Sequence, residues 1–262
     1  MEKVCIIIPA HNEEKVIGNT LKEYGAYFQN LKKNKIIDFE ILVVLNGCKD
    51  NTLQIVKTEK KKIKEISYLD FKEAGKGFAI IKGFKEALKQ KNEYIGFVDA
   101  DFATPAFAFN DLLKKIDKDD GIIASRWLSG AKIKKQTIQR RILSRGFNFI
   151  TRSLFLMPYA DTQCGAKLFR RRLIEKVVNK IGLTQWAFDV NLLYLGRKYG
   201  FKIKEIPTTW SDKEDSKLNI TKTPLQMLLG VIRLRLINSV FEPLLKNIKF
   251  ILHFGDWLLN QK

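Results

Sequence analysis

The chain has 262 residues, of which 45% are hydrophobic, and its 47 lysines and arginines outnumber its 28 aspartates and glutamates. This length and apolar content suit one domain of ordinary size and exclude wholesale disorder. The formal net charge of +19 favours an anionic partner: nucleic acid, an anionic membrane surface or a phosphorylated substrate. The lysines of residues 57–64 can equally be read as solvated surface.

The three cysteines lie far apart, and no pair has the spacing of a metal site, which is typical of a reduced, cytoplasmic protein. A strand-like run begins within the first few residues, which leaves no room for a signal peptide. Charged residues interrupt the longest apolar region, residues 225–259, so no stretch approaches the roughly 20 residues that cross a bilayer. We therefore expect a protein that is soluble or lies on a membrane surface.

The first hundred residues alternate between strand and helix patterns. Short apolar runs predict strands at residues 4–9, 40–45, 66–69 and 94–98. Amphipathic spacing and capping residues predict helices at residues 17–31, from residue 51, and at residues 77–88. Such alternation favours an α/β fold with a Rossmann-like, open and mostly parallel sheet flanked by helices.

The pattern changes from residue 122 onward, where it becomes mainly helical and basic residues interleave with aromatic ones. We interpret residues 1–222 as one catalytic domain. Residues 223–262 read as amphipathic helices that lie at a membrane interface or pack in a dimer.

Polar clusters follow three of the expected strands, at residues 9–13, 46–50 and 99–101. Ligands of open parallel sheets bind beyond the carboxyl ends of the strands, so these clusters are expected to meet at one edge. Asp99 and Asp101 need compensation there, which a divalent cation supplies, because carboxylate oxygens suit Mg²⁺ or Mn²⁺. The triplet Asp99-Ala100-Asp101 therefore predicts a metal beside a diphosphate.

Six short motifs occur in an order that resembles family 2 glycosyltransferases of the GT-A fold. They are IPAHNE at residues 8–13, GKG at 75–77, DAD at 99–101, SR at 125–126, DTQCGAKLF at 161–169 and SKL at 216–218. Within that family the chain looks most like the polyprenyl-phosphate hexose synthases of the dolichyl-phosphate glucosyltransferase and mannosyltransferase type. The run from residue 161 is the most specific of the six.

The resemblance implies an inverting, metal-dependent transfer of glucose or mannose from a UDP- or GDP-hexose to a polyprenyl phosphate. It implies donor-binding roles for Pro9, Ala10, Asn12, Glu13, Asn46, Lys76 and Ala100. The residues it places in catalysis are Asp99, Asp101, Arg126, Asp161, Lys167 and Asp189. Arg140 and Ser144, four residues apart on an expected helix, would hold the acceptor phosphate with Arg145 and Lys217.

Two departures from the family pattern bear on these roles. The family commonly has two acidic residues after its second strand, whereas this chain has Leu45 and Asn46, which leaves the nucleotide open. The glutamate often found after Phe-Asp-Val is Asn191 here, so a general base at that position is in question.

A general base is not required if the acceptor is a lipid monophosphate, because its second pKa near 6 leaves it largely ionised at neutral pH. If the acceptor is instead a glycan or another hydroxyl, Asp161 or Asp189 is the expected base. Nucleic-acid binding is disfavoured, since no recognised motif accompanies the basic charge. We therefore expect a peripheral enzyme on the cytosolic membrane face; the sequence leaves open whether it is a homo-oligomer.

Overall fold

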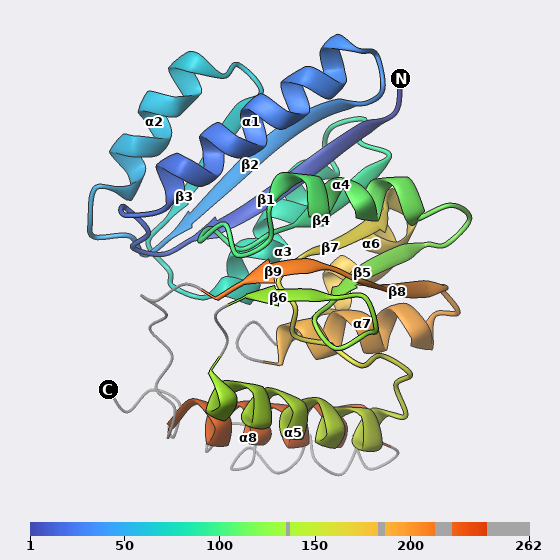
Figure 1. Cartoon of the computed structure of the whole chain (residues 1–262). Helices are drawn as coiled ribbons and strands as arrows, with labels where there is room; N and C mark the ends of the chain where they lie inside the picture. Colours follow the sequence, from blue (N-terminus) through green and yellow to red (C-terminus); the bar gives the residue numbers. More distant parts are fainter. Residues whose placement is uncertain (135–136, 183–186, 213–221, 240–262) are drawn as a thin grey trace.

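The computed structural model describes residues 1–134, 137–182, 187–212 and 222–239 (Figure 1). Within these residues, the strands of the main sheet run in the order β3-β2-β1-β4-β7-β5-β8. They are β1 (Lys3–Ala10), β2 (Asp38–Asn46), β3 (Ile66–Phe71), β4 (Tyr94–Phe97), β5 (Gly121–Ser125), β7 (Lys167–Arg170) and β8 (Ile203–Pro207). Only β7 pairs antiparallel, with β4 and β5. The predicted open, mostly parallel α/β sheet is thus confirmed.

Helices cover both faces of this sheet (Figure 1). One face carries α1 (Ile17–Lys33), α2 (Thr52–Lys62) and α4 (Ala106–Lys115). The other carries α3 (Lys76–Ala87), α6 (Arg171–Val177), which continues into the 3₁₀ helix η1 (Val178–Lys180), and α7 (Phe188–Lys198).

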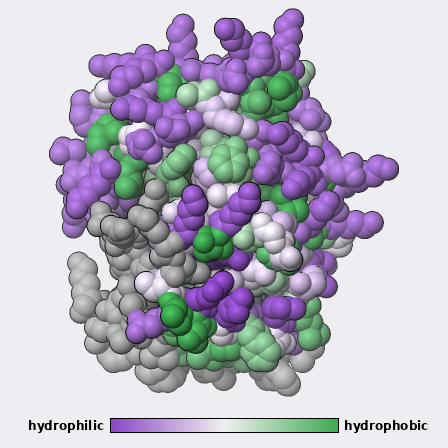
Figure 2. All heavy atoms as spheres, in the orientation of Figure 1, coloured by the Kyte–Doolittle hydropathy of each residue, from purple (hydrophilic) through white to green (hydrophobic). Residues whose placement is uncertain are grey.

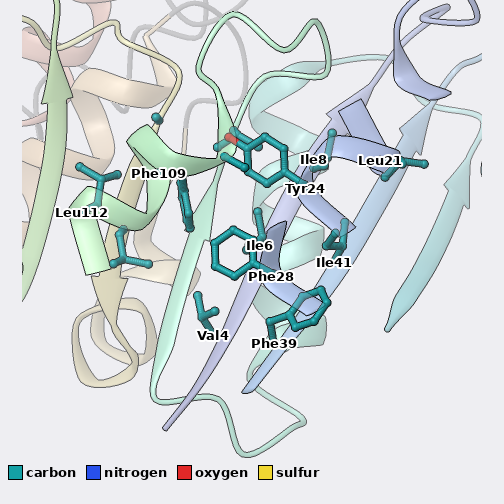
Figure 3. Packing of buried hydrophobic residues seen from close by; sticks show 14 of the residues in the cluster. Val4, Ile6, Ile8, Leu21, Tyr24, Phe28, Phe39, Ile41, Phe109 and Leu112 are labelled. Atoms are coloured by element: carbon teal, nitrogen blue, oxygen red, sulfur yellow. The ribbon is translucent and has the colours of Figure 1, made fainter. Parts of the chain in front are cut away.

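Strand β1 lies in the middle of the core and alternates its side chains between the two layers. Val4, Ile6 and Ile8 pack with Tyr24 and Phe28 of α1, as Figure 3 shows. The intervening residues of β1 face the opposite layer, and the strand is fully buried from residue 4 onward. Burial on both faces is the reason its sequence is continuously apolar.

The strand order reverses beside β1. The chain proceeds from β1 to β2 and β3 on one side, and then places β4 on the other side of β1. The carboxyl ends of β1 and β4 therefore lie next to each other at the point where α/β sheets bind their ligands.

The second half of the chain contains more strands than its mainly helical pattern indicates. Besides β5, β7 and β8, it forms β6 (Lys132–Lys134) and β9 (Thr209–Ser211), which pair as a small parallel sheet. These strands have three to five residues, which is too short for a period of two to stand out in the sequence.

Helices α5 (Ile138–Phe155) and α8 (Lys222–Ile237) pack against each other below the main sheet (Figure 1). Val231 and Leu234 of α8 are buried in the same cluster as Phe188 of α7. Most of the expected tail, residues 240–262, lies outside the described residues, so its role at a membrane or in a dimer stays a prediction.

Candidate active site at the carboxyl edge of the sheet

Asn46, at the end of β2, joins three segments of this edge. Its side-chain amide donates to the carbonyl oxygen of Ala10 at 2.9 Å, and its side-chain oxygen accepts from the Gly75 amide at 2.9 Å. The residue is 2% exposed. Asn46 therefore fixes the ends of β1 and β2 against the start of α3, and both ends of its amide are engaged within the protein.

The loop after β1 carries the residues expected to bind the donor. Pro9 and Ala10 are the last residues of β1, and both are buried. Asn12 has a positive φ of 54°, and its side-chain oxygen accepts from the Lys49 amide at 2.7 Å. The Glu13 amide donates to Thr52 Oγ1 at 2.8 Å. The loop is thus anchored to the start of α2 through main-chain and Asn12 bonds.

Asp99 follows β4 and lies between a cation and a glycine. Its Oδ1 pairs with the ammonium of Lys76, the first residue of α3. A side chain at Gly165 would overlap the Asp99 carboxylate, which therefore rests directly on the main chain there. Glycine at position 165 is what allows the DTQCGAKLF run to approach the DAD triplet.

The charges around Asp99 favour its ionised form. Burial acts to raise the pKa of Asp99, but Lys76, Lys167 and Arg126 together hold it below its ordinary value. The same carboxylate raises the pKa of Lys76 against the opposing effect of burial. Positive charge thus already gathers where a donor diphosphate is expected.

The DAD triplet fits a Mg²⁺ or Mn²⁺ ion. Asp99 and Asp101 both offer carboxylate oxygens beyond β4, and the carbonyl of the intervening Ala100 accepts from Thr20 Oγ1 at 2.6 Å, which fixes the turn. No group of three or more His, Cys, Asp or Glu side chains suited to a metal occurs among the described residues. Magnesium commonly takes only one or two carboxylates and completes its shell with substrate phosphates and water.

Arg126, which follows β5, forms a two-pronged ion pair with Asp161. Its Nε and Nη2 donate to the two carboxylate oxygens at 2.7 and 2.9 Å, and its main-chain amide donates to Oδ2 at 3.0 Å. Asp161 is fully buried. Burial acts to raise its pKa, yet Arg126 and Lys167 lower it, so the carboxylate stays ionised as the partner of Arg126.

Lys167 opens β7 and is fully buried. Its ammonium donates to Asp189 Oδ1 and to the Cys164 carbonyl oxygen, both at 2.6 Å. Because β7 runs antiparallel, its first residue lies at the same sheet edge as the last residues of β4. The resemblance implies a catalytic role for Lys167; in the structure its ammonium bonds the turn that carries Cys164.

Two residues that the sequence did not single out hold the turn of residues 160–164. The Glu205 carboxylate of β8 accepts from the amides of Ala160 and Asp161 at 2.8 and 2.7 Å. Asn148 of α5 accepts from the Thr162 amide and hydroxyl, both at 2.9 Å. In the sequence, an asparagine between Phe147 and Phe149 of an amphipathic helix is a signal that could have indicated such a link.

Aromatic and cationic side chains stack beside the Arg126–Asp161 pair. The Arg126 guanidinium lies 5.3 Å from the ring centre of Trp210 and 5.5 Å from that of Trp127. The Arg145 guanidinium of α5 lies 5.1 Å from the ring centre of Trp127, so both arginines contact this tryptophan. Such contacts orient guanidinium groups. The stack connects α5 to the site.

The expected acceptor residues are only partly placed. Ser144 Oγ lies 3.4 Å from Arg126 Nη2, from which it accepts a hydrogen bond, so α5 does reach the site. Arg140 belongs to the same helix, but its side chain lies outside the described residues, as does the whole of Lys217.

Comparison with known proteins agrees with this geometry. The sequence profile of Glycosyl transferase family 2 matches residues 5–178. The dolichyl-phosphate beta-glucosyltransferase of Dictyostelium discoideum is 34% identical over 88% of this chain and 73% of its own length. The human protein of that name is 30% identical over 90% of this chain and 75% of its own.

A solved structure shares the fold. Glucosyl-3-phosphoglycerate synthase from Mycobacterium tuberculosis, crystallised with Mn²⁺, UDP and phosphoglyceric acid, superimposes with a TM-score of 0.66. It is 13% identical and covers 91% of this chain and 80% of its own, a level that establishes the GT-A fold alone. Among the described residues, no helix is both long and apolar enough to span a bilayer.

Proposed function

Because the chain belongs to glycosyl transferase family 2, we propose that it transfers glucose from a nucleotide sugar to dolichyl phosphate or a similar polyprenyl phosphate. The two relatives described above are named dolichyl-phosphate beta-glucosyltransferases, so their names give this lipid phosphate as the acceptor. UDP-glucose is the donor we expect first, with Mg²⁺ or Mn²⁺ as cofactor.

The ion pairs of Asp161 and Asp189 are the observation that favours one acceptor over the other. A hydroxyl acceptor needs a general base, and these were the two carboxylates that the sequence offered. Asp161 is held in a bidentate pair with Arg126, and Asp189 is paired with the buried Lys167. An acceptor that arrives already ionised needs neither, which favours a lipid monophosphate.

The transfer we propose is an in-line displacement with inversion. A phosphate oxygen of the acceptor bonds to the anomeric carbon of glucose while the bond to the nucleoside diphosphate breaks. When bound, the divalent cation neutralises charge on the leaving diphosphate. Lys76 and Arg126 both add positive charge near Asp99, so two anions approach in line with their repulsion screened.

The remaining assignments follow from these contacts. We propose that Asp161 orients Arg126, that Lys167 supports the turn of residues 160–164, and that Asn46 positions the donor loop rather than reading the base itself. Because the acceptor is a lipid, we propose that the enzyme works as a peripheral protein at a membrane surface; the three widely spaced cysteines favour its cytosolic face.

A donor panel tests the proposal. The full chain is incubated with UDP-glucose, UDP-galactose or GDP-mannose, a short-chain polyprenyl phosphate and Mg²⁺ or Mn²⁺, and the lipid product is analysed. We expect lipid-linked glucose from UDP-glucose, and none when Asp101→Asn replaces the wild type. Absence of a lipid-linked sugar with every donor contradicts the proposed function.

Arg140 distinguishes a phosphate acceptor from a hydroxyl acceptor. Arg140→Ala is expected to abolish transfer to polyprenyl phosphate while leaving UDP-glucose binding unchanged, because it would remove an acceptor contact only. Arg141→Ala, the adjacent and exposed arginine on the same helix, is the matched control and should stay active. Equal activity of the two variants would contradict the assignment of a lipid phosphate as acceptor and would favour a hydroxyl acceptor instead.

A further inference from the structure

Helix α5 presents large apolar side chains to solvent. Ile138, Ile142 and Phe149 are 77%, 65% and 71% exposed, and Leu156, which directly follows the helix, is 82% exposed. Single exposed apolar residues are ordinary, but a contiguous set of this size marks a surface that meets an apolar partner. Figure 2 shows hydrophobic side chains beside hydrophilic ones over α5, at the lower edge of the described surface.

The exposed residues form one stripe, which we call the α5 stripe. Spacings of four, three, four and three place five positions on one helix face: Ile138, Ile142, Arg145, Phe149 and Arg152. Leu156 continues the exposed apolar surface just beyond the end of the helix. Another face of the helix, with Phe147, Asn148, Thr151 and Phe155, is buried in the protein. The stripe is therefore a surface that the fold of the described residues leaves uncovered.

The charge of α5 is entirely positive. The helix contains four arginines and neither aspartate nor glutamate, and Arg145 and Arg152 lie exposed within the stripe. The neighbouring α8 adds exposed Leu229 and Ile232 and likewise has no acidic residue. Apolar side chains interleaved with arginines match a surface that offers hydrocarbon below a layer of anionic phosphates.

We propose that the α5 stripe is the surface on which this enzyme lies on an anionic membrane, an inference that rests on the proposed function. Phe149 and the isoleucines enter the acyl boundary, and Arg145 and Arg152 extend to lipid phosphates. Arg145 also stacks on Trp127 beside Arg126, so the stripe adjoins the site. A lipid-borne acceptor phosphate then reaches the site without leaving the membrane surface.

The alternatives fit the stripe less well. A second copy of the chain would bury arginines against a helix that has no carboxylate to pair with them, which is costly. A nucleic acid or a free anion would satisfy the arginines but leave the apolar side chains in water.

Vesicle binding by the full chain, without donor or acceptor, tests the inference. Vesicles of phosphatidylcholine with phosphatidylserine are compared with phosphatidylcholine alone, and bound protein is measured by co-sedimentation. The double variant Ile142→Ser with Phe149→Ser is expected to bind about tenfold more weakly or worse, since two side chains lose hydrocarbon contact. Arg152→Gln should reduce binding only to the anionic vesicles.

The matched control is Ile36→Ser with Phe107→Ser, which removes two apolar side chains that are 63% and 48% exposed elsewhere. Circular dichroism should show both double variants folded, because all four side chains lie at the surface. Equal vesicle binding by the two double variants overturns the inference, as does a dimer of the wild type that only the stripe variant loses. Vesicle binding without sugar transfer from any donor would overturn the proposed function and leave the α5 stripe standing.

Discussion

Asp99 owes its position to two neighbours that lie far from it in the sequence. Lys76 neutralises one of its oxygens, and the absence of a side chain at Gly165 leaves room for the other. The carboxylate is therefore preorganised beyond β4 rather than free to turn in a loop, as the proposed stabilisation of a leaving diphosphate would require.

Gly165→Ala tests this packing. A methyl group would displace the Asp99 carboxylate, and a misplacement of about 1 Å at a reacting centre costs on the order of 100-fold in rate. We expect such a loss of transfer activity in steady-state assays, with the protein still folded by circular dichroism. Gly146→Ala, where a side chain meets nothing within 4 Å, is the control and should remain active. Comparable activity of the two variants would contradict the role given to Gly165.

The Arg126–Asp161 pair is the second arrangement decided by single residues. Breaking a buried pair by removing one charge leaves the other uncompensated, at a cost of about 3–5 kcal/mol. Asp161→Asn is therefore expected to lower the free energy of unfolding by about that amount at pH 7 in urea titrations. Asp70→Asn, on the exposed side of β3, should change it little.

The pH dependence of this pair has a definite sign. The folded-state pKa of Asp161 lies below its ordinary value of 3.8, so the pair stabilises the native state at higher pH. That contribution is lost as the pH falls through the lowered pKa. The difference in unfolding free energy between wild type and Asp161→Asn should therefore be full at neutral pH and shrink below about pH 4. A difference that stays constant into acid would show that the carboxylate acts by packing alone.

At the scale of elements, α5 and α8 connect the site to the periphery. Helix α5 supplies Ser144 to Arg126 and Asn148 to the turn of residues 160–164 on one face, and it carries the α5 stripe on another. Helix α8 packs against α5, and its buried Val231 and Leu234 join the core beside α7. These contacts make α8 a support of the part of the molecule that contains α5 and α7.

Adjacent residues of α8 test that support. Val231→Asp would bury an unpaired carboxyl group and is expected to destabilise the protein by about 3 kcal/mol or more. Ile232→Asp, whose side chain is 40% exposed, should cost about 1 kcal/mol or less. Thermal unfolding of both variants gives the comparison. Equal melting temperatures would mean that α8 behaves as a separate appendage.

At the scale of the whole molecule, the net charge of +19 raises the question of which anionic partner the protein binds. Purely electrostatic binding weakens steeply with salt, whereas binding with an apolar component persists. We expect a generic oligonucleotide to dissociate by about 0.2 M salt, because phosphate contacts alone would hold it. Part of the protein should stay bound to anionic vesicles at the same salt concentration. Fluorescence anisotropy and co-sedimentation measure the two, and oligonucleotide binding that outlasts vesicle binding would reverse the assignment.

Four strands of the main sheet and the position of its functional edge could be predicted from the amino-acid sequence. Continuous apolar runs such as residues 4–9 predict strands buried on both faces, and parallel strands bring the polar clusters after them to one edge. The DAD triplet and the DTQCGAKLF run likewise identified the family before any contact was known. Local pattern was sufficient there because burial and strand direction fix which residues share an edge.

The partners of the buried charges became clear only in the folded chain. Asp161 lies 35 residues from Arg126, and Lys167 lies 22 residues from Asp189, so no spacing in the sequence reveals these partners. The short strands after residue 120 and the exposure of the α5 stripe were equally hidden, because an amphipathic period states that two faces differ but not which one the fold covers. Pairing and exposure are properties of long-range packing, and packing is settled only when the whole chain is folded.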